Sequence, residues 1–451
     1  MSQSAWVDDL NAALLTDLYE LKMLQAYLDE GLEETATFDL FVRRLPKNRN
    51  YLLTCGLDDA LRYLEQLSFG PECLAYLEAC GGFSTRFLDR LSRFRFHGDV
   101  FAVPEGTPLF AGEPLLEIVA PLPEAQLVET FVMNQVHFQT LVASKASRVV
   151  SAAAGRRIVD FGLRRIHGAD AGLKAARAFF IAGVDATSNV LAGRVYGIPT
   201  AGTMAHSYVQ AHEDESEAFR AFAARYPGTT LLVDTYDTLA GVQKVIRLAR
   251  EMGDRFDVSA LRLDSGDLAE LGSAARRMLD EAGLRHVELF ASSSLDEYAV
   301  AELVASGADF RGFGVGTRMG VSDDAPYLDM AYKLVEYAGS PRTKLSPGKL
   351  ILPGRKQVFR RSDEGRAVGD VIARRDEAIE GRSLLVEVMR AGRRLAAGCD
   401  TLPAARARAR RELAALPDGL HALGAADPPY RVEVSPALAV EQQRARTRAR
   451  G

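Results

Sequence analysis

Short β-rich runs alternate with helical segments between residues 156 and 317, and this alternation restricts the fold of the 451-residue chain more than any other feature. Repeated β–helix–β units favour a parallel sheet with crossover helices, and the number of units is near what a closed barrel requires. We therefore predict an α/β fold built on an irregular (β/α) barrel. The β-rich runs lie at 156–162, 182–188, 195–200, 229–237, 258–267, 286–294 and 310–317. The helices are expected at 170–181, 206–226, 238–252, 267–282 and 295–305.

The residues before this region follow a different pattern. An amphipathic helix over 11–30 is expected to end at Gly31, and an alternating strand follows over 35–46. These features predict an N-terminal α+β domain over 1–145, a barrel-like catalytic domain over 146–345, and a C-terminal segment over 346–451 that packs on the N-terminal domain. Further helices are expected at 51–67, 71–80, 83–92, 123–154 and 404–417, short β elements at 94–121 and 366–399, and a frayed, solvated tail at 441–451.

Composition excludes several classes of protein. A formal net charge of −5 gives no reason to expect a nucleic-acid partner. The N-terminus lacks the pattern of a signal peptide, and no apolar run is long enough to span a bilayer. Four cysteines occur without a CxxC pair. A reduced, cytoplasmic protein without a membrane partner is the expectation.

Polar and glycine-bearing clusters follow the predicted strands, where ligands bind in barrels and open parallel sheets. His206 stands behind a loop of small residues at the start of a predicted helix, with room for a ligand beside it. Taken alone, a histidine there is more simply a packing or capping residue. The polar clusters expected on the same face of the sheet as His206 favour a functional role.

Two late clusters carry phosphate signals. The run GFGVGT places Gly314, Gly316 and Thr317 after a strand, and such glycines let backbone N–H groups approach an anion. Ser292, Ser293 and Ser294 precede a predicted helix N-terminus one unit earlier. Either cluster alone is equally explained by a tight turn or a helix cap, but their adjacent positions favour a phosphorylated ligand.

Charged residues at the other strand ends suit an anionic, aromatic ligand. Arg262 and Asp264 share a face of one strand; the arginine can clamp a carboxylate, while the aspartate can hold ribose hydroxyls or a phosphate-bound Mg²⁺. An Arg–Asp ion pair is the structural alternative. Phe161, Arg164 and Arg165 suit ring stacking and phosphate binding, and Asp234 or Asp237 could orient His206. The chain lacks GxSxG, HExxH, a Walker A motif and a GxGxxG run that opens a βαβ unit.

Together the motifs resemble the nicotinate phosphoribosyltransferase family over nearly the whole chain and in the expected order. The resemblance is carried by LLTDLYELKM (14–23), DFGLRR (160–165), GTMAHS (202–207), VDTYDT (233–238), LRLDSGDL (261–268), GFGVGT (312–317) and LPGRKQVFR (352–360). The segment EGTPLFAGEPLLEI (105–118) is similar to the N-terminal domain of the wider class of quinolinate and nicotinamide phosphoribosyltransferases. The resemblance implies a type II phosphoribosyltransferase-like fold.

The family implies condensation of nicotinate with 5-phosphoribosyl 1-diphosphate (PRPP), assisted by ATP and Mg²⁺, in a homodimer with shared active sites. By motif, His206 would be phosphorylated by ATP, Thr203 and Arg262 would contact nicotinate, and Tyr19 would stack on the pyridine ring from a neighbouring subunit. Thr317, the preceding glycines and the Ser292–Ser294 turn would hold the 5-phosphate, while Arg164 and Asp264 would contact phosphate and ribose or metal. We assign the orientation of His206 to Asp234.

Two positions depart from simple expectation. Family members often carry a glycine within the turn that Ser292–Ser294 occupies. Asp185 falls where nicotinamide-specific relatives bind the amide, and an aspartate would repel a nicotinate carboxylate. A nicotinamide enzyme and a catalytically silent, ligand-binding homologue stay open as alternatives. A quinolinate enzyme fits less well, because two carboxylates require a denser basic pocket.

Overall fold

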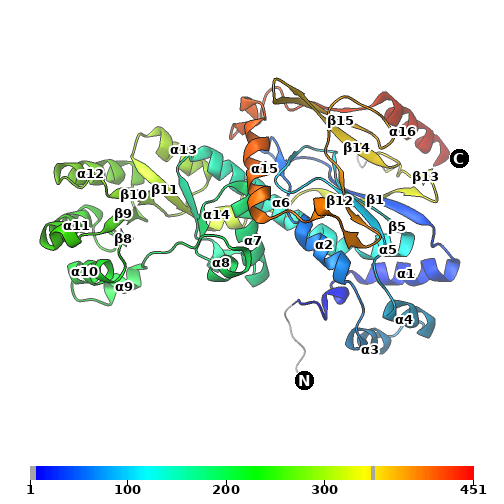
Figure 1. Ribbon diagram of the computed structural model, residues 1–451, viewed down its shortest axis with the longest axis horizontal. Coiled ribbons are helices and arrows are strands. Elements are labelled where there is room, and N and C mark those ends of the chain that lie inside the picture. The colour runs from blue at the N-terminus through cyan, green and yellow to red at the C-terminus, as the bar shows by residue number, and fades with distance from the viewer. Residues whose placement is uncertain (1–6, 347–350, 451) are drawn as a thin grey trace. The chain divides into compact units, whose positions relative to one another are not determined.

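The computed structural model describes residues 7–346 and 351–450, and the chain divides into two compact units. The unit formed by the middle of the sequence, called the central unit, comprises Val142–Pro326. The outer unit combines Met1–Leu141 with Tyr327–Gly451, so both ends of the chain belong to the same unit. Each unit has its own main sheet (Figure 1).

The central unit is built on a six-stranded parallel sheet in the order β7-β6-β11-β10-β9-β8. In the described residues the two edge strands do not pair with each other, so the barrel is incomplete. Helices follow the strands as crossovers, which confirms the predicted α/β class. The strands are β6 (Arg157–Asp160), β7 (Ala186–Thr187), β8 (Thr229–Leu232), β9 (Val258–Leu263), β10 (Glu288–Ala291) and β11 (Phe310–Val315). The crossover helices include α7 (Ala169–Ala182), α11 (Thr238–Met252), α12 (Leu268–Glu281) and α13 (Glu297–Ala305).

Aspartates that follow the strands begin three of these helices. Asp237 accepts a hydrogen bond from Ala240 N at 2.7 Å, and Asp267 accepts one from Glu270 N at 3.0 Å. Asp296 does the same for α13. Each carboxylate satisfies N–H groups that have no partner within the helix. Part of the polar character at the strand ends is therefore helix capping.

Two predicted elements of the central unit differ in the structure. The run 195–200 is not a strand: Val195 and Tyr196 are the last residues of α8 (Val190–Tyr196), and only Thr200 forms an isolated parallel bridge, to Thr187. Asn189 caps this helix through Ala192 N, and Gly197 ends it with φ of 69°. A cap and a left-handed glycine thus outweigh the β preference of the run.

The single helix predicted over 206–226 is broken into α9 (His206–Gln210) and α10 (Glu215–Arg225). Asp214 is the N-cap of α10 and accepts a hydrogen bond from Ser216 N at 3.1 Å. The short α9 consequently holds His206 on a separate element from the amphipathic α10.

The outer unit contains a seven-stranded antiparallel sheet in the order β13-β12-β1-β5-β3-β17-β18, which interleaves strands from both ends of the chain. Its inner strand β1 (Thr35–Val42) is buried from Ala36 onward, so the predicted alternation is wrong because both faces are covered. Asp39 of this strand is buried against Lys356 Nζ at 2.9 Å. The other strands are β3 (Asp99–Ala102), β5 (Pro114–Pro121), β12 (Met330–Tyr337), β13 (Ser340–Pro341), β17 (Val386–Arg390) and β18 (Arg393–Arg394).

Helices of the N-terminal part lie where the sequence predicts them, and several of them begin later than predicted. The helix predicted from residue 11 begins as α1 at Leu18, after a 3₁₀ turn at Ala12–Leu14. The helix predicted over 51–67 begins with β2, and the one over 123–154 is divided in two. The bounds are α1 (Leu18–Glu30), α2 (Leu57–Gln66), α3 (Pro71–Cys80), α4 (Thr85–Ser92), α5 (Leu122–Leu127) and α6 (Glu129–Ala152), with β2 (Leu52–Leu53) paired to β4 (Pro108–Leu109).

The last hundred residues add a four-stranded sheet and two helices to the outer unit. The expected frayed tail is wrong: α16 (Pro436–Arg448) covers most of it, with Ser435 capping Leu438 N at 3.1 Å. A serine cap followed by proline is a strong helix start that outweighs the charged composition. The elements are β14 (Lys356–Asp363), β15 (Arg366–Arg374), β16 (Arg382–Ser383), β19 (Val432–Val434) and α15 (Leu402–Ala414).

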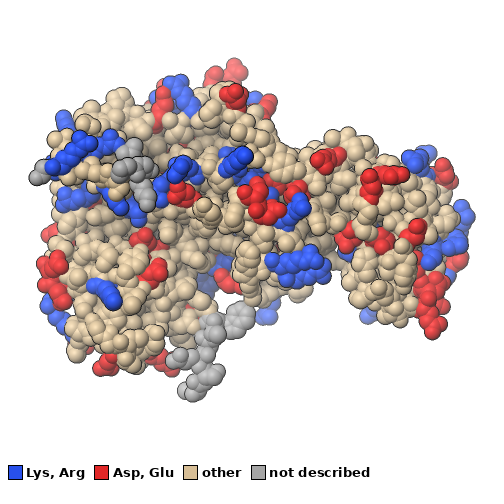
Figure 2. Space-filling view, turned by 180° about the vertical axis from the view of Figure 1, so that it is seen from behind, with Lys and Arg blue, Asp and Glu red and all other residues tan. Residues whose placement is uncertain are grey.

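Lysine and arginine side chains are interspersed with aspartate and glutamate on the face seen in Figure 2. Among the described residues, no helix combines the length and the apolar character needed to cross a membrane.

Candidate active site

The carboxyl ends of the parallel strands carry most of the predicted site residues. Segments that follow parallel strands emerge along one edge of the sheet, where ligands of such folds bind. His206 joins this edge from the start of α9. The residues that follow or end the strands are Phe161 and Arg164 (β6), Asp234 (β8), Arg262 and Asp264 (β9), Ser292, Ser293 and Ser294 (β10), and Gly314, Gly316 and Thr317 (β11).

The imidazole of His206 is held between a hydroxyl and a carboxylate. Nδ1 lies 3.1 Å from Thr235 Oγ1, and Nε2 lies 3.7 Å from Asp264 Oδ2. The side chain remains 39% exposed. The sequence led us to expect Asp234 beside this ring, but its neighbour Thr235 faces the ring instead. With Nδ1 turned to the hydroxyl, Nε2 is the nitrogen left for chemistry.

Asp234 organises the turn after β9. Its Oδ2 accepts hydrogen bonds from Asp264 N at 2.8 Å and from Ser265 Oγ at 2.6 Å. Its Oδ1 is buried and, within the described residues, has no hydrogen-bond partner. Asp264 is held further by Ser292 Oγ, which donates to Oδ1 at 2.5 Å. Asp234 therefore contacts Asp264, the residue beside His206 Nε2, rather than the imidazole, and Ser265 is a member of this network that the sequence did not single out.

Arg262 presents one edge of its guanidinium to the candidate site. Its Nη1 donates to Thr203 Oγ1 at 2.7 Å, and its guanidinium lies 5.8 Å from the centre of the Phe161 ring. Its Nε is buried without a hydrogen-bond partner among the described residues. Burial lowers the pKa of this guanidinium, against the opposing effect of Asp264 and Asp234. A buried donor without a partner is costly, so this edge is suited to a planar anion that would bind it.

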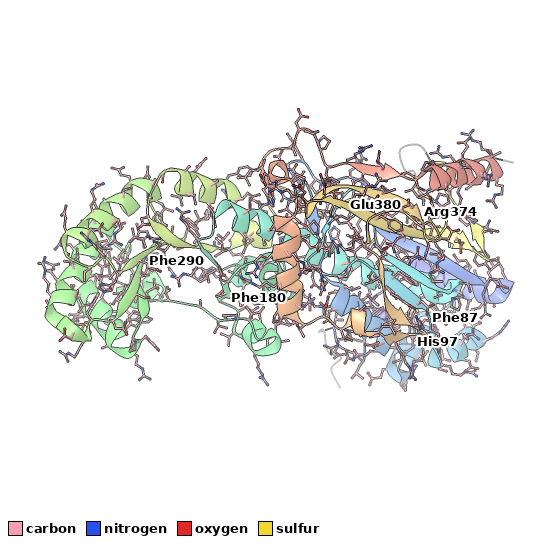
Figure 3. All side chains as sticks on the ribbon, turned by 45° about the horizontal axis from the view of Figure 1, so that its top comes forward. Phe87, His97, Phe180, Phe290, Arg374 and Glu380 are labelled. Atoms are coloured by element: carbon pink, nitrogen blue, oxygen red, sulfur yellow. The ribbon has the colours of Figure 1, made fainter. Side chains whose placement is uncertain are left out.

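The glycines of β11 make room for aromatic rings. A Cβ on Gly314 would lie 2.5 Å from the Phe161 ring, and one on Gly312 would lie 2.8 Å from the Phe290 ring. Phe161 and Phe290 are themselves 6.2 Å apart between centroids, and Figure 3 labels Phe290 on β10. The structure therefore gives Gly314 a packing role in addition to the predicted phosphate role. Because Gly314 has no side chain, the ring of Phe161 can lie below Arg262.

The serine turn after β10 is partly engaged within the fold. Ser292 N donates to Leu263 O at 2.8 Å, and Asp296 Oδ1 accepts from Tyr298 N and Ala299 N. The first N–H groups of α13 are therefore capped by a carboxylate. Ser293 and Ser294 are exposed, and Ser293 has φ of 117°, a conformation that favours glycine.

Replacing Ser293 by glycine is expected to raise the free energy of unfolding by about 1 kcal/mol, because the backbone strain at this residue is relieved. Denaturant unfolding monitored by circular dichroism measures the change. Ser294→Gly is the matched control, since Ser294 has no positive φ, and it should be neutral or destabilising. Equal stabilisation by both changes, or none by Ser293→Gly, would show that Ser293 is unstrained.

Thr317 is linked to the turn after β6. Arg165 Nη1 donates to Thr317 Oγ1 at 3.3 Å, and both Arg164 and Arg165 are exposed on the 3₁₀ turn Leu163–Arg165. The FGLRR run predicts Arg165 together with Arg164 as site residues. Thr235, in contrast, was missed within VDTYDT. There the motif was identified and the neighbouring residue makes the contact with His206.

Comparison with known proteins gives the family. A model described as the nicotinate phosphoribosyltransferase (NAPRTase) N-terminal domain matches residues 14–137, and one described as the nicotinate phosphoribosyltransferase (NAPRTase) family matches residues 156–349. Over 434 residues the chain is 54% identical to nicotinate phosphoribosyltransferase pncB2 of Mycobacterium tuberculosis, covering 96% of this chain and 94% of the relative. The chain belongs to the nicotinate phosphoribosyltransferase family. The resemblance predicted from its motifs is confirmed.

Other members of the nicotinate phosphoribosyltransferase family agree. The Bacillus subtilis nicotinate phosphoribosyltransferase is 41% identical over 395 residues, covering 85% of this chain and 80% of the relative. The crystal structure of human nicotinic acid phosphoribosyltransferase superposes with a TM-score of 0.84 at 27% identity, covering 95% of this chain and 99% of that one. A nicotinate-nucleotide pyrophosphorylase from Pyrococcus furiosus shares the fold, with a TM-score of 0.74 at 24% identity, covering 92% of this chain and 98% of that one. The type II phosphoribosyltransferase-like fold is thereby confirmed.

Two further residues of this family member have clear local settings. Asp185 accepts a hydrogen bond from Ile158 N at 2.9 Å and donates its own N–H to Ile158 O, so its carboxylate supports the pairing of β7 with β6. This contact gives the aspartate a structural role in the sheet. Tyr19 lies on α1 of the outer unit, and its side chain is 47% exposed.

Proposed function

We propose that the chain condenses nicotinate with PRPP to form nicotinate mononucleotide and diphosphate, in NAD biosynthesis, with ATP as a co-substrate. The single observation that carries the substrate class is the Arg262 edge. A half-buried arginine with an unpaired Nε, fixed by Thr203 and placed over Phe161, offers a fork for one carboxylate beside an aromatic surface. Family membership supplies the reaction.

The transfer step balances without a general base. The pyridine nitrogen lone pair of nicotinate forms a bond to C1′ of the phosphoribosyl group, and the C1′–O bond to diphosphate breaks, with its electron pair leaving on diphosphate. No proton is lost, since the attacking nitrogen carries none. In this proposal Arg262 and Thr203 orient the ring through its carboxylate, and the Ser293, Ser294, Gly316 and Thr317 region receives the 5-phosphate. Orientation of this kind lowers the barrier by removing rotational freedom beforehand.

His206 is proposed to couple ATP to this transfer. If Nδ1–H donates to Thr235 Oγ1, the Nε2 lone pair attacks the γ-phosphorus of ATP, and the bond from that phosphorus to the β–γ bridging oxygen breaks as ADP leaves. The ring keeps its single N–H, so no proton must be removed. Water later takes the phosphoryl group from Nε2 as orthophosphate. Asp264, 3.7 Å from Nε2, stabilises the ring when it becomes cationic.

The carboxylates present fit a Mg²⁺ ion shared with substrate phosphates. Within the described residues, no group of three or more His, Cys, Asp or Glu side chains forms a metal site. Mg²⁺ bound to phosphates requires only one or two protein carboxylates, and the buried, unpaired Oδ1 of Asp234 beside Asp264 meets this need. Asp264 and Asp234 would hold the ion, which would neutralise charge on the leaving diphosphate.

A cytoplasmic homodimer with shared active sites completes the proposal. Exposed apolar side chains, which often mark interaction surfaces, occur in both units. In the outer unit they include Leu10 (81%), Leu18 (56%) and Tyr19 (47%), and in the central unit Val190 (77%) and Val195 (54%) of α8. Tyr19 would reach the pyridine ring of the partner subunit's site.

The test is an assay of the purified full chain with PRPP and each of nicotinate, nicotinamide and quinolinate, with and without ATP. Nicotinate mononucleotide should form from nicotinate and be stimulated by ATP, in a preparation whose light scattering gives the mass of two chains. Product only from nicotinamide would support the runner-up activity. Ligand binding without any product would support the silent homologue, and an active monomer would overturn the placement of Tyr19.

A further inference from the structure

A closed ring of charged side chains links the segment after β10 to the segment after β11. At its centre Lys145 of α6 is 1% exposed, and its Nζ lies 2.6 Å from Glu297 Oε2, 2.8 Å from Asp324 Oδ1 and 3.2 Å from Asp323 Oδ1. Glu297 is the first residue of α13, and its side chain is fully buried. Asp323 and Asp324 follow α14 (Thr317–Gly320).

The ring closes through Arg318 of α14. Its Nη1 lies 2.5 Å from Asp296 Oδ2, and its Nε lies 3.7 Å from Asp323 Oδ2. Asp296 is also the N-cap of α13, directly before Glu297. Arg148, one turn further along α6 than Lys145, adds a second cation, with Nε 2.9 Å from Glu297 Oε1.

The ring includes residues that follow each of the two proposed phosphate segments, at the starts of α13 and α14. Asp296 and Glu297 follow the Ser292–Ser294 turn within a few residues, and Arg318 directly follows Thr317. Lys145 bonds both sides at once, through Glu297 after β10 and through Asp323 and Asp324 after β11. A change in its contacts would therefore alter the spacing between the two segments.

The charges of the ring point to positioning rather than attraction. The cations Lys145, Arg148 and Arg318 are outnumbered by the carboxylates Asp296, Glu297, Asp323 and Asp324, so the ring has no net positive charge to offer a phosphate. Buried ion pairs seldom stabilise a fold more than apolar packing of the same volume would. The presence of these buried ion pairs is better explained by the fixed geometry that several simultaneous ion pairs impose on the segments they join.

We propose that Lys145 is a positioning residue for the phosphate subsite: through Glu297 and Asp324 it fixes the spacing of the two segments that bind the 5-phosphate of the phosphoribosyl substrate. This inference rests on the proposed function, because it assigns the 5-phosphate to these segments. The donors of a phosphate site must be placed within a fraction of an ångström, so a small change in spacing weakens binding.

The decisive variant is Asp324→Ala. Its side chain is 28% exposed, and its removal leaves Lys145 paired with Glu297, so the fold should survive. Removing a negative charge near a phosphate would strengthen binding if long-range attraction governed affinity. Positioning predicts the opposite: binding of ribose 5-phosphate should weaken by about fivefold to tenfold, while the Kd for nicotinate stays unchanged.

A second variant and a matched control separate positioning from general loss of stability. Lys145→Met with Glu297→Gln removes both fully buried charges together and should weaken ribose 5-phosphate binding by about tenfold or more. Lys244→Met is the control, because Lys244 Nζ pairs with the buried Glu215 at 2.9 Å between α11 and α10 and contacts neither phosphate segment. It should lower stability and leave both ligand affinities unchanged.

The measurement is calorimetric titration of the full chain with ribose 5-phosphate and, separately, with nicotinate, neither of which permits turnover alone. Wild-type binding of ribose 5-phosphate with unchanged or tighter binding by folded Asp324→Ala would overturn the inference and leave the proposed function standing. If the ring variants lost affinity for ribose 5-phosphate and for nicotinate by the same factor, the inference would also be overturned. A wild-type chain that binds no ribose 5-phosphate would contradict the proposed function itself.

Discussion

Replacing His206 by alanine is expected to abolish the stimulation of nucleotide formation by ATP and to reduce ATP hydrolysis by about 100-fold or more. The reason is the position of the ring: Nδ1 faces Thr235 Oγ1 at 3.1 Å, Nε2 faces Asp264 across 3.7 Å, and the side chain is open enough to meet a second substrate. Alanine removes the only atom that the proposal allows to accept the phosphoryl group. Initial rates with and without ATP measure the loss of stimulation.

Labelling provides a second readout of the same prediction. With ATP carrying a labelled γ-phosphate, the wild-type chain should acquire a label that is labile in acid and stable in base, as a phosphoramidate is, and His206→Ala should acquire none. ATP-independent transfer should persist in the variant, since Arg262 and the phosphate segments are untouched. The variant therefore separates the coupling step from the transfer step.

His212→Ala is the matched control. His212 lies just beyond the end of α9, and its Nδ1 is 2.9 Å from Tyr208 O, so its ring is committed to a local contact. This variant should keep ATP stimulation and labelling. If His206→Ala retained both, or if His212→Ala lost them equally, His206 would not be the phosphoryl carrier.

The edge of the sheet where the site lies could be predicted because parallel topology leaves little choice. Once β–helix units were identified, Asp234, Arg262 and Ser292 had to follow neighbouring strands at the same end of the sheet, and the order β10-β9-β8 places them there. Thr203 was identified only by its motif, yet the structure brings its hydroxyl to Arg262 Nη1 at 2.7 Å.

Choices between adjacent residues could not be predicted in the same way. Asp234 and Thr235 are neighbours after β8, and the twist of the loop decides that the hydroxyl meets His206 while the carboxylate turns to the 264–265 segment. A carboxylate is the commoner partner of a working histidine, which is why the sequence favoured Asp234. The competing backbone N–H of Asp264 is invisible in the sequence.

Glycine-rich runs have two meanings that the sequence cannot separate. The triplet in β11 was interpreted as a phosphate loop, but Gly312 and Gly314 lie against the rings of Phe290 and Phe161. Gly316 follows the strand, and a Cβ there would meet Phe161 O at 2.9 Å. The close approach of a backbone atom or an aromatic ring explains the glycine at each position. A role in phosphate binding depends on the ligand, which the local packing does not reveal.

Caps explain the errors in element boundaries. Asp214 and Ser435 begin helices where the sequence pattern gave an uninterrupted helix and a frayed tail, and Asn189 begins α8, which extends into the start of the strand predicted at 195–200. Each supplies a side-chain oxygen to a free N–H in the first turn. One such bond decides where an element begins when the periodicity of the sequence is weak.

Replacing Arg262 by methionine is expected to lower kcat/KM for nicotinate by about 100-fold and to change that for nicotinamide by no more than about threefold. With Nη1 committed to Thr203, the free edge of the guanidinium is formed by Nε and Nη2. The outer unit shows what this edge does: Arg360 binds Asp370 through Nε at 3.0 Å and Nη2 at 2.7 Å. A nicotinate carboxylate fits the same fork, and an amide does not.

Arg262→Lys tests the fork separately from the charge. A lysine keeps the positive charge but offers a single point donor, so most of the loss should remain. Arg157→Met is the matched control, since Arg157 begins β6 in the same sheet and its side chain is 61% exposed in a pair with Glu288. Steady-state rates with both substrates at saturating PRPP measure all three variants.

The ratio of the two substrates is the informative quantity, because a misfolded site would depress both. Loss of the Arg262 fork should reduce the preference for nicotinate over nicotinamide by the same factor as it reduces kcat/KM for nicotinate. If Arg262→Met lowered kcat/KM for nicotinate and for nicotinamide alike, Arg262 would be holding Phe161 and Thr203 in place rather than binding the carboxylate. An unchanged preference in Arg262→Lys would assign recognition to charge alone. The geometry favours the fork, because the Thr203 hydroxyl and the Phe161 ring fix the plane of the guanidinium before any ligand arrives.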